Sequence, residues 1–83
     1  MKTTRYFDEQ VLRKRPYIQP DACERVIATA LKRVVQPDGR VRYWGAVTDP
    51  RDGKRRIMRV VTLEDGQTVH NAFFDRDYRE DLK

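Results

Sequence analysis

The only histidine of the chain, His70, carries the one side chain whose ordinary pKa suits proton transfer near pH 7. Three arginines could act with it: Arg42, Arg59 and Arg76. RNA can be cleaved without a metal, because its 2′-hydroxyl can attack the neighbouring phosphorus when a base takes the proton, cations stabilise the transition state and an acid protonates the leaving oxygen. These residue types indicate a candidate site for that chemistry. The alternative is a structural histidine whose hydrogen bonds are satisfied within the fold.

Basic residues are concentrated in one part of the chain. Residues 32–59 contain nine basic and three acidic side chains, a balance of +6, whereas residues 60–83 contain three basic and six acidic side chains, a balance of −3. A basic patch attracts nucleic acid through counterion release. We predict that RNA binds to Arg40, Arg42, Trp44, Lys54, Arg55 and Arg56. The alternative is a solvated surface with no ligand.

Several function classes are disfavoured by what the sequence lacks. One cysteine, Cys23, beside one histidine does not make a zinc site, and there is no phosphate-binding glycine loop, serine nucleophile motif or paired-carboxylate motif. We therefore expect no metal and no cofactor. No apolar stretch is long enough to span a bilayer or to act as a signal peptide, so the expected location is the cytoplasm.

Two helices are predicted in the N-terminal half. The first spans about residues 5–15, with Phe7 and Val11 on one face, and ends at Pro16. The second begins at Pro20, which suits the first position of a helix. Its apolar residues follow helical spacing and are Cys23, Val26, Ile27, Ala30, Leu31 and Val34.

Three strands are predicted after Gly39, where the apolar period changes from helical to alternating. They span residues 40–48, 55–63 and 67–74, and are separated by the Asp-Gly pairs at 52–53 and 65–66. Such pairs are a strong hairpin signal. The chain is thus expected to form a single α+β domain over residues 1–83, with two N-terminal helices packed on a three-stranded antiparallel meander.

The two turns also predict which residues share a face of the sheet. Centring the second turn on Asp65-Gly66 places Val61 opposite His70 and Ile57 opposite Phe74. One face, predicted to lie under the helices, then holds Val41, Tyr43, Gly45, Val47, Met58, Val60, Thr62, Val69, Asn71 and Phe73. The other, open face holds Arg42, Trp44, Ala46, Ile57, Arg59, Val61, Leu63, Thr68, His70, Ala72 and Phe74. It combines guanidinium groups for phosphates, an indole for base stacking and an imidazole for proton transfer.

The segment after the last strand contains Tyr78 and Arg79, where the tail could fold back over the open face. The alternative is a frayed charged terminus.

The sequence also resembles a known superfamily. Residues 40–80, RVRYWGAVTDPRDGKRRIMRVVTLEDGQTVHNAFFDRDYRE, resemble the sheet of the BrnT-type toxins and the wider RelE-like ribonuclease fold. The helical half, FDEQVLRKRPYIQPDACERVIATALKRVVQPDGR, is similar to an uncharacterised bacterial family regarded as related to them. The resemblance implies an RNA-cleaving sheet face with Arg59 and His70 on the strands and Arg76 and Tyr78 after them.

Two functions from different classes follow. The first is a type II toxin-like, metal-independent endoribonuclease that acts on RNA, including ribosome-associated mRNA, and is silenced by a small antitoxin protein. The second is a non-catalytic module that uses the same face for a protein or a nucleic acid. The expected assembly is a homodimer or a complex with the antitoxin, away from the membrane.

Overall fold

The computed structural model describes residues 1–78, which form an α+β fold with two short helical regions and a four-stranded antiparallel sheet. The first helix starts as a π-helical segment, η1 (Phe7–Val11), and continues as α1 (Leu12–Lys14). Then follow α2 (Pro20–Thr29), β1 (Lys32–Val35), β2 (Val41–Thr48), β3 (Arg55–Thr62) and β4 (Val69–Phe74). Arg79 lies outside the described residues.

The first helix is fixed at its start by Thr4, whose hydroxyl oxygen accepts a hydrogen bond from the backbone N–H of Phe7. This contact satisfies one of the donors that a helix N-terminus leaves free. Phe7 and Val11 are buried, as their spacing predicts. The N-terminal residues also pair with the outer edge of β4 through Thr3 and Val69, so this helix closes one side of the sheet.

The second helix is shorter than its apolar pattern predicts. It begins at Pro20 as expected and buries Ala22, Cys23 and Val26, but it ends at Thr29. The expected continuation to Val34 is wrong, because residues 32–35 form β1 and pair with β2. Val34 and Val35 are β-branched and favour a strand. The sheet therefore has a fourth strand that the sequence analysis missed.

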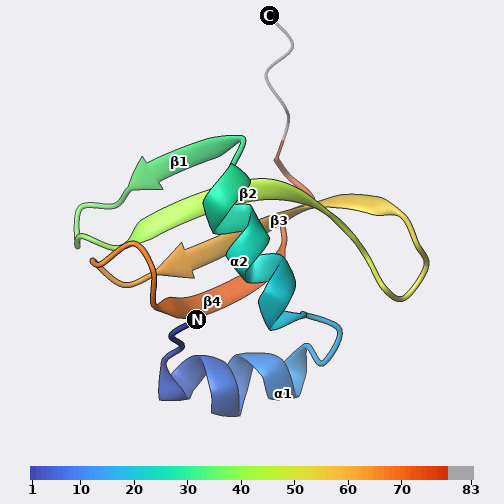
Figure 1. The fold of residues 1–83 in the computed structure, drawn as a ribbon, viewed down its shortest axis with the longest axis horizontal. Coiled ribbons are helices and arrows are strands. Elements are labelled where there is room, and N and C mark those ends of the chain that lie inside the picture. The colour runs from blue at the N-terminus through green and yellow to red at the C-terminus, as the bar shows by residue number, and fades with distance from the viewer. Residues whose placement is uncertain (79–83) are drawn as a thin grey trace, which may run out of the picture.

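The sheet order is β1-β2-β3-β4, and each neighbouring pair is antiparallel (Figure 1). The three predicted strands are confirmed as β2, β3 and β4. Both Asp-Gly turns are also confirmed, since Gly53 and Gly66 have φ values of 73° and 71°, which glycine adopts without strain. Within the described part of the chain, no strand pairs with the outer edge of β1.

The predicted faces are correct for the β2–β3 hairpin and wrong for part of the β3–β4 hairpin. In the β2–β3 pair, Trp44 lies opposite Arg59, close to its predicted place, and Asp49 rather than Arg51 faces Lys54. In the β3–β4 pair, Val61 lies opposite Asn71 rather than His70, and Phe74 lies opposite Met58 rather than Ile57.

The cause of this shift is a β-bulge between Val61 and Thr62, at which β4 contains the extra residue His70. Each later residue of β4 moves to the other face. Ala72 and Phe74 therefore join the face that α2 covers, and Asn71 and Phe73 join the opposite face.

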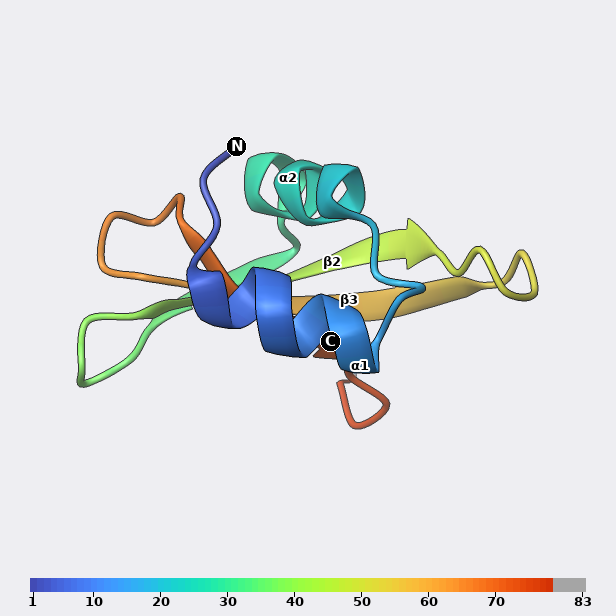
Figure 2. The same cartoon turned by 90° about the horizontal axis from the view of Figure 1, so that it is seen from below.

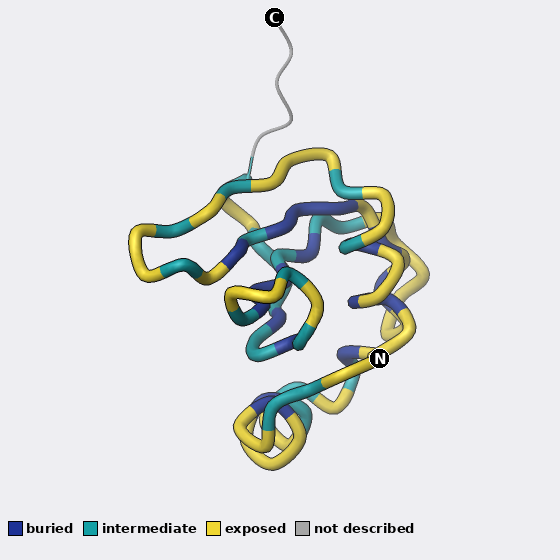
Figure 3. The backbone as a smooth tube through the Cα atoms, turned by 60° about the vertical axis from the view of Figure 1, so that its left-hand side comes forward, coloured by how far each residue is buried: buried dark blue, intermediate teal, exposed yellow. Residues whose placement is uncertain are grey.

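The core lies between α2 and one face of the sheet, as the view from below shows (Figure 2). Val26 of α2 approaches Gly45 of β2 closely, because a Cβ atom at Gly45 would lie 3.1 Å from its methyl groups. Buried segments run through the middle of the sheet while the hairpins are exposed (Figure 3). In residues 1–78 we find no helix whose length and apolar content would let it cross a membrane. We call the face of the sheet away from α2 the open face from here on.

Candidate functional site

A straight row of side chains crosses the open face, with one residue from each strand. Register pairs place Lys32 of β1 opposite Trp44 of β2, Trp44 opposite Arg59 of β3, and Arg59 opposite Phe73 of β4. Lys32 Nζ lies 5.4 Å from the centroid of the Trp44 ring, and Arg59 Cζ lies 4.6 Å from that of Phe73. Arg15, which follows α1, extends the row beyond Phe73, with its Cζ 5.8 Å from that ring. This cation-aromatic row therefore alternates positive charge and ring.

Arg59 is the central residue of the row, and its guanidinium lies between the rings of Trp44 and Phe73. Its Nε atom is buried and has no hydrogen-bond partner in the described structure. Burial lowers the pKa of Arg59 below its ordinary value, and the nearby positive charge of Arg42 lowers it further, while Asp75 opposes the shift. An unsatisfied N–H group beside a second guanidinium is the environment that an anion would stabilise.

Trp44 is in the predicted place but is not open to stacking. The residue is only 7% exposed, and its indole Nε1 donates a hydrogen bond to Asp75 Oδ2 at 2.9 Å. The ring of Tyr78 stacks on it at a centroid distance of 5.9 Å. The chain after β4 therefore folds back over the open face as far as Tyr78, in agreement with one of the two alternatives above. A base could stack on Trp44 only after Tyr78 moved aside.

A cleft is lined by the loop after α1, the β2–β3 hairpin, and the end of β4 with the segment that follows it. Its volume is about 740 Å³. Its lining contains five arginines and a single acidic residue, Asp75, together with four aromatic rings. We call this feature the arginine cleft; its lining residues are Arg15, Tyr17, Arg51, Arg55, Arg56, Ile57, Phe73, Phe74, Asp75, Arg76 and Tyr78.

Four of the predicted site residues meet in the arginine cleft: Arg55, Arg56, Arg76 and Tyr78. The cleft adjoins the cation-aromatic row, since Phe73 belongs to both. Lys54 is exposed in the β2–β3 turn, where its backbone N–H is bonded to the Asp52 carboxylate. Thus the basic residues predicted to bind RNA on β3 are brought together with the C-terminal segment.

A buried carboxylate, that of Asp49, holds two arginines of the arginine cleft in place. Asp49 is fully buried and accepts hydrogen bonds from the backbone N–H, Nε and Nη2 of Arg51 and from Nε of Arg56. The bond from the Arg51 side chain, with that from Arg56, holds the pKa of Asp49 well below its usual range although burial opposes this. The same bonds raise the pKa of both arginines. Sequence analysis missed Asp49, Arg51, Arg15 and Tyr17.

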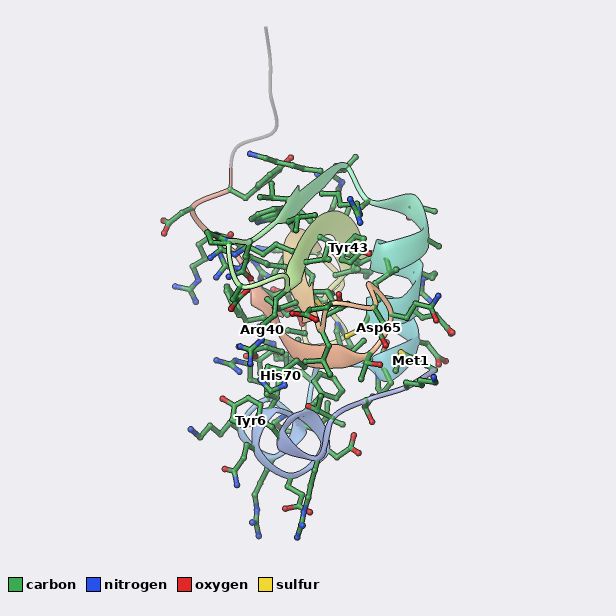
Figure 4. The ribbon with its side chains drawn as sticks, turned by 90° about the vertical axis from the view of Figure 1, so that its left-hand side faces the viewer. Met1, Tyr6, Arg40, Tyr43, Asp65 and His70 are labelled. Atoms are coloured by element: carbon green, nitrogen blue, oxygen red, sulfur yellow. The ribbon has the colours of Figure 1, made fainter. Side chains whose placement is uncertain are left out.

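His70 lies at the other end of β4, in the bulge. Its Nδ1 is 3.0 Å from the Thr4 hydroxyl oxygen, and its ring stacks on Tyr6 at a centroid distance of 4.8 Å. Figure 4 shows His70 and Tyr6 together, with Arg40 beside them, on the side of the sheet away from α2. Burial lowers the pKa of His70, and Arg40 adds to the shift.

The expectation that His70 lies diagonally next to Arg59 is wrong. Phe73 occupies the position opposite Arg59, and His70 is about 10 Å further back along the strand at the usual rise per residue. The cation beside the imidazole is Arg40.

The geometry so far defines a small α+β protein with a cationic and aromatic face that ends in an arginine cleft. Among residues 1–78 there is no group of three or more histidine, cysteine or acidic side chains arranged to hold a metal ion. Comparison with models of protein families, with curated proteins and with solved structures gave no match.

Proposed function

We propose that this protein binds single-stranded RNA on the open face, along the cation-aromatic row from Lys32 to the arginine cleft. The observation that carries the proposal is the row itself, because cations that alternate with rings match a strand that alternates phosphates and bases, with Tyr78 moving off Trp44 when a base binds there. The positive charge of Arg59, with that of Arg42 nearby, attracts a phosphate to the middle of the row.

Single-stranded nucleic acid fits this face better than a duplex does. A duplex presents an outer surface of phosphates, and aromatic side chains would find no unstacked bases there. The choice of RNA rests on the resemblance of residues 40–80 to the sheet of RelE-like ribonucleases. A non-catalytic protein-binding module remains the competing function, and it predicts no dependence on the arginines of the row for binding to RNA.

A second candidate function is metal-independent RNA cleavage near His70, as in a type II toxin that a small antitoxin protein would silence. The supporting observation is the lowered pKa of His70, because a neutral imidazole is the form that can accept a proton at pH 7. The contact with Thr4 fixes the ring through Nδ1, and Nε2 is the atom left for a substrate. In this proposal Arg40, rather than Arg59, is the cation next to the reacting phosphate.

The binding test uses a fluorescently labelled single-stranded RNA and measures anisotropy. Arg59→Gln should weaken binding about tenfold or more, since a hydrogen bond to a charged group is worth roughly 1.5–3 kcal/mol. The matched control is Arg25→Gln, which changes an exposed arginine on α2, on the other side of the sheet. Equal affinities for wild type and Arg59→Gln would reject RNA binding by this face.

The cleavage test incubates the same RNA with protein in the presence of a chelator. Products that form with wild type and disappear with His70→Gln support the endoribonuclease. If RNA binds but no cleavage product forms, the RNA-binding function is retained and the endoribonuclease function is rejected.

A further inference from the structure

The arginine cleft contains two guanidinium groups that are oriented before any ligand arrives. Arg51 uses Nε and Nη2 to bind Asp49, and Arg56 uses Nε to bind Asp49 and Nη2 to bind Asp52. In each side chain, Nη1 is therefore the terminal nitrogen that remains for another acceptor. Because Asp49 is buried and holds both groups, little side-chain freedom is lost when an anion binds.

Aromatic rings hold the same arginine from the other side. Arg51 Cζ lies 3.8 Å from the centroid of the Tyr17 ring, and Tyr17 in turn stacks on Phe74 at 5.6 Å. A guanidinium packed on a ring keeps its plane, so its free N–H groups keep their direction. Arg51 is thus fixed by a carboxylate and by a ring, which is more support than a solvated surface arginine needs.

The charge of the cleft suggests a dianionic ligand. Its lining contains five arginines and one acidic residue, and two of these arginines, Arg51 and Arg56, are bound by Asp49 and Asp52. An internal phosphodiester carries a single charge, whereas a terminal phosphate carries about −1.5 to −2 at pH 7 and has three acceptor oxygens. Several guanidinium groups around one cleft match the second ligand better than the first.

We infer that the arginine cleft binds the terminal phosphate of a nucleotide, with Arg51 and Arg56 as the oriented donors and Asp49 as the residue that positions them. The inference rests on the proposed function where the nucleotide is the end of the bound RNA strand. A cleft of about 740 Å³ has room for one nucleotide, and its aromatic walls suit the base. From its terminal phosphate in the arginine cleft, the RNA strand would then run along the cation-aromatic row.

The experiment compares one RNA sequence with a 5′-phosphate, with a 3′-phosphate and with hydroxyl groups at both ends. One of the two phosphorylated strands should bind about tenfold to a hundredfold more tightly than the hydroxyl-ended strand. Adenosine 5′-monophosphate alone, followed by NMR shifts of the arginine side chains, shows whether a free nucleotide suffices. Equal affinities for all three strands, with no shifts from the mononucleotide, would overturn the inference.

Two variants separate positioning from folding. Asp49→Asn removes the charge that orients Arg51 and Arg56 and should abolish the preference for a phosphate end. Arg15 lies on the cleft wall and contacts the ring of Phe73, so Arg15→Gln should fold normally and reduce the same preference. A preference that survives in folded samples of both variants contradicts the assignment.

The outcome is distinguishable from failure of the proposed function. RNA binding that depends on Arg59 but ignores the terminal phosphate refutes the cleft inference alone. Absence of RNA binding together with mononucleotide shifts at Arg51 refutes the RNA function and retains the nucleotide site.

Discussion

The salt dependence of RNA binding gives the sharpest test of how much of the open face is used. Each phosphate that the protein neutralises on a single strand contributes about −0.7 to the slope of log K against log salt concentration. If the strand contacts only the part of the row that lies on the sheet, with Arg42 beside it, the cations are Lys32, Arg42 and Arg59, and the slope should be about −2. If it continues into the arginine cleft, Arg15, Arg51 and Arg56 join, and the slope should be about −4.

These slopes correspond to different losses of affinity in one titration. Between 50 and 200 mM salt, affinity should fall about 20-fold for the short path and about 300-fold for the long path. The assay is anisotropy of a labelled strand at four or more salt concentrations. Arg59→Gln should reduce the slope by about 0.7, and Arg25→Gln should leave it unchanged. A wild-type slope near zero, or an equal reduction in both variants, would refute the electrostatic reasoning.

Three further predictions concern the fold that supports the face. Phe7→Ala should cost about 3–5 kcal/mol of unfolding free energy, because Phe7 is fully buried, and urea denaturation would measure it. The folded pKa of His70 lies below its unfolded value, so its contribution to stability is present above about pH 6.5 and is lost as the pH falls through the folded pKa. Denaturation midpoints between pH 7 and 5 should show this loss in wild type and not in His70→Gln. Burial raises the pKa of Cys23 to about 12, so a thiol reagent at pH 8 should label it only after unfolding; rapid labelling of folded protein would contradict its burial.

Local patterns were sufficient to predict most of the secondary structure. Proline and aspartate mark the start of α2, and Asp-Gly pairs mark the turns between β2 and β3 and between β3 and β4. The end of α2 was mispredicted because Ala30, Leu31 and Val34 fit helical spacing from Cys23. Two β-branched residues at the same place favour a strand, and pairing with β2 satisfies their backbone groups. A short segment can fit both the helical and the alternating spacing of apolar residues. Its tertiary contacts then determine whether it forms a helix or a strand.

The arginine cleft was harder to predict, because its parts come from three separate regions of the chain. Arg15 follows a helix, where a basic residue is already explained by the helix dipole. Arg51 lies in a turn, and Tyr17 lies in a loop between helices. The one local signal was the acidic and basic alternation around Pro50, with Asp49 before it and Arg51 after it. Burial of Asp49, which turns this alternation into a rigid support, is a tertiary property.

The β-bulge in β4 determines which face of the sheet Phe73 and Phe74 each occupy. Without the extra residue, Phe74 would lie on the open face and Phe73 would be buried under α2. With it, Phe73 completes the cation-aromatic row beside Arg59, while Phe74 stacks with Tyr17 and supports the arginine cleft. The bulge also places His70 against Thr4 and Tyr6. A single inserted residue therefore links the row, the cleft and the histidine, and any change that removed it would exchange the two phenylalanines and disturb all three.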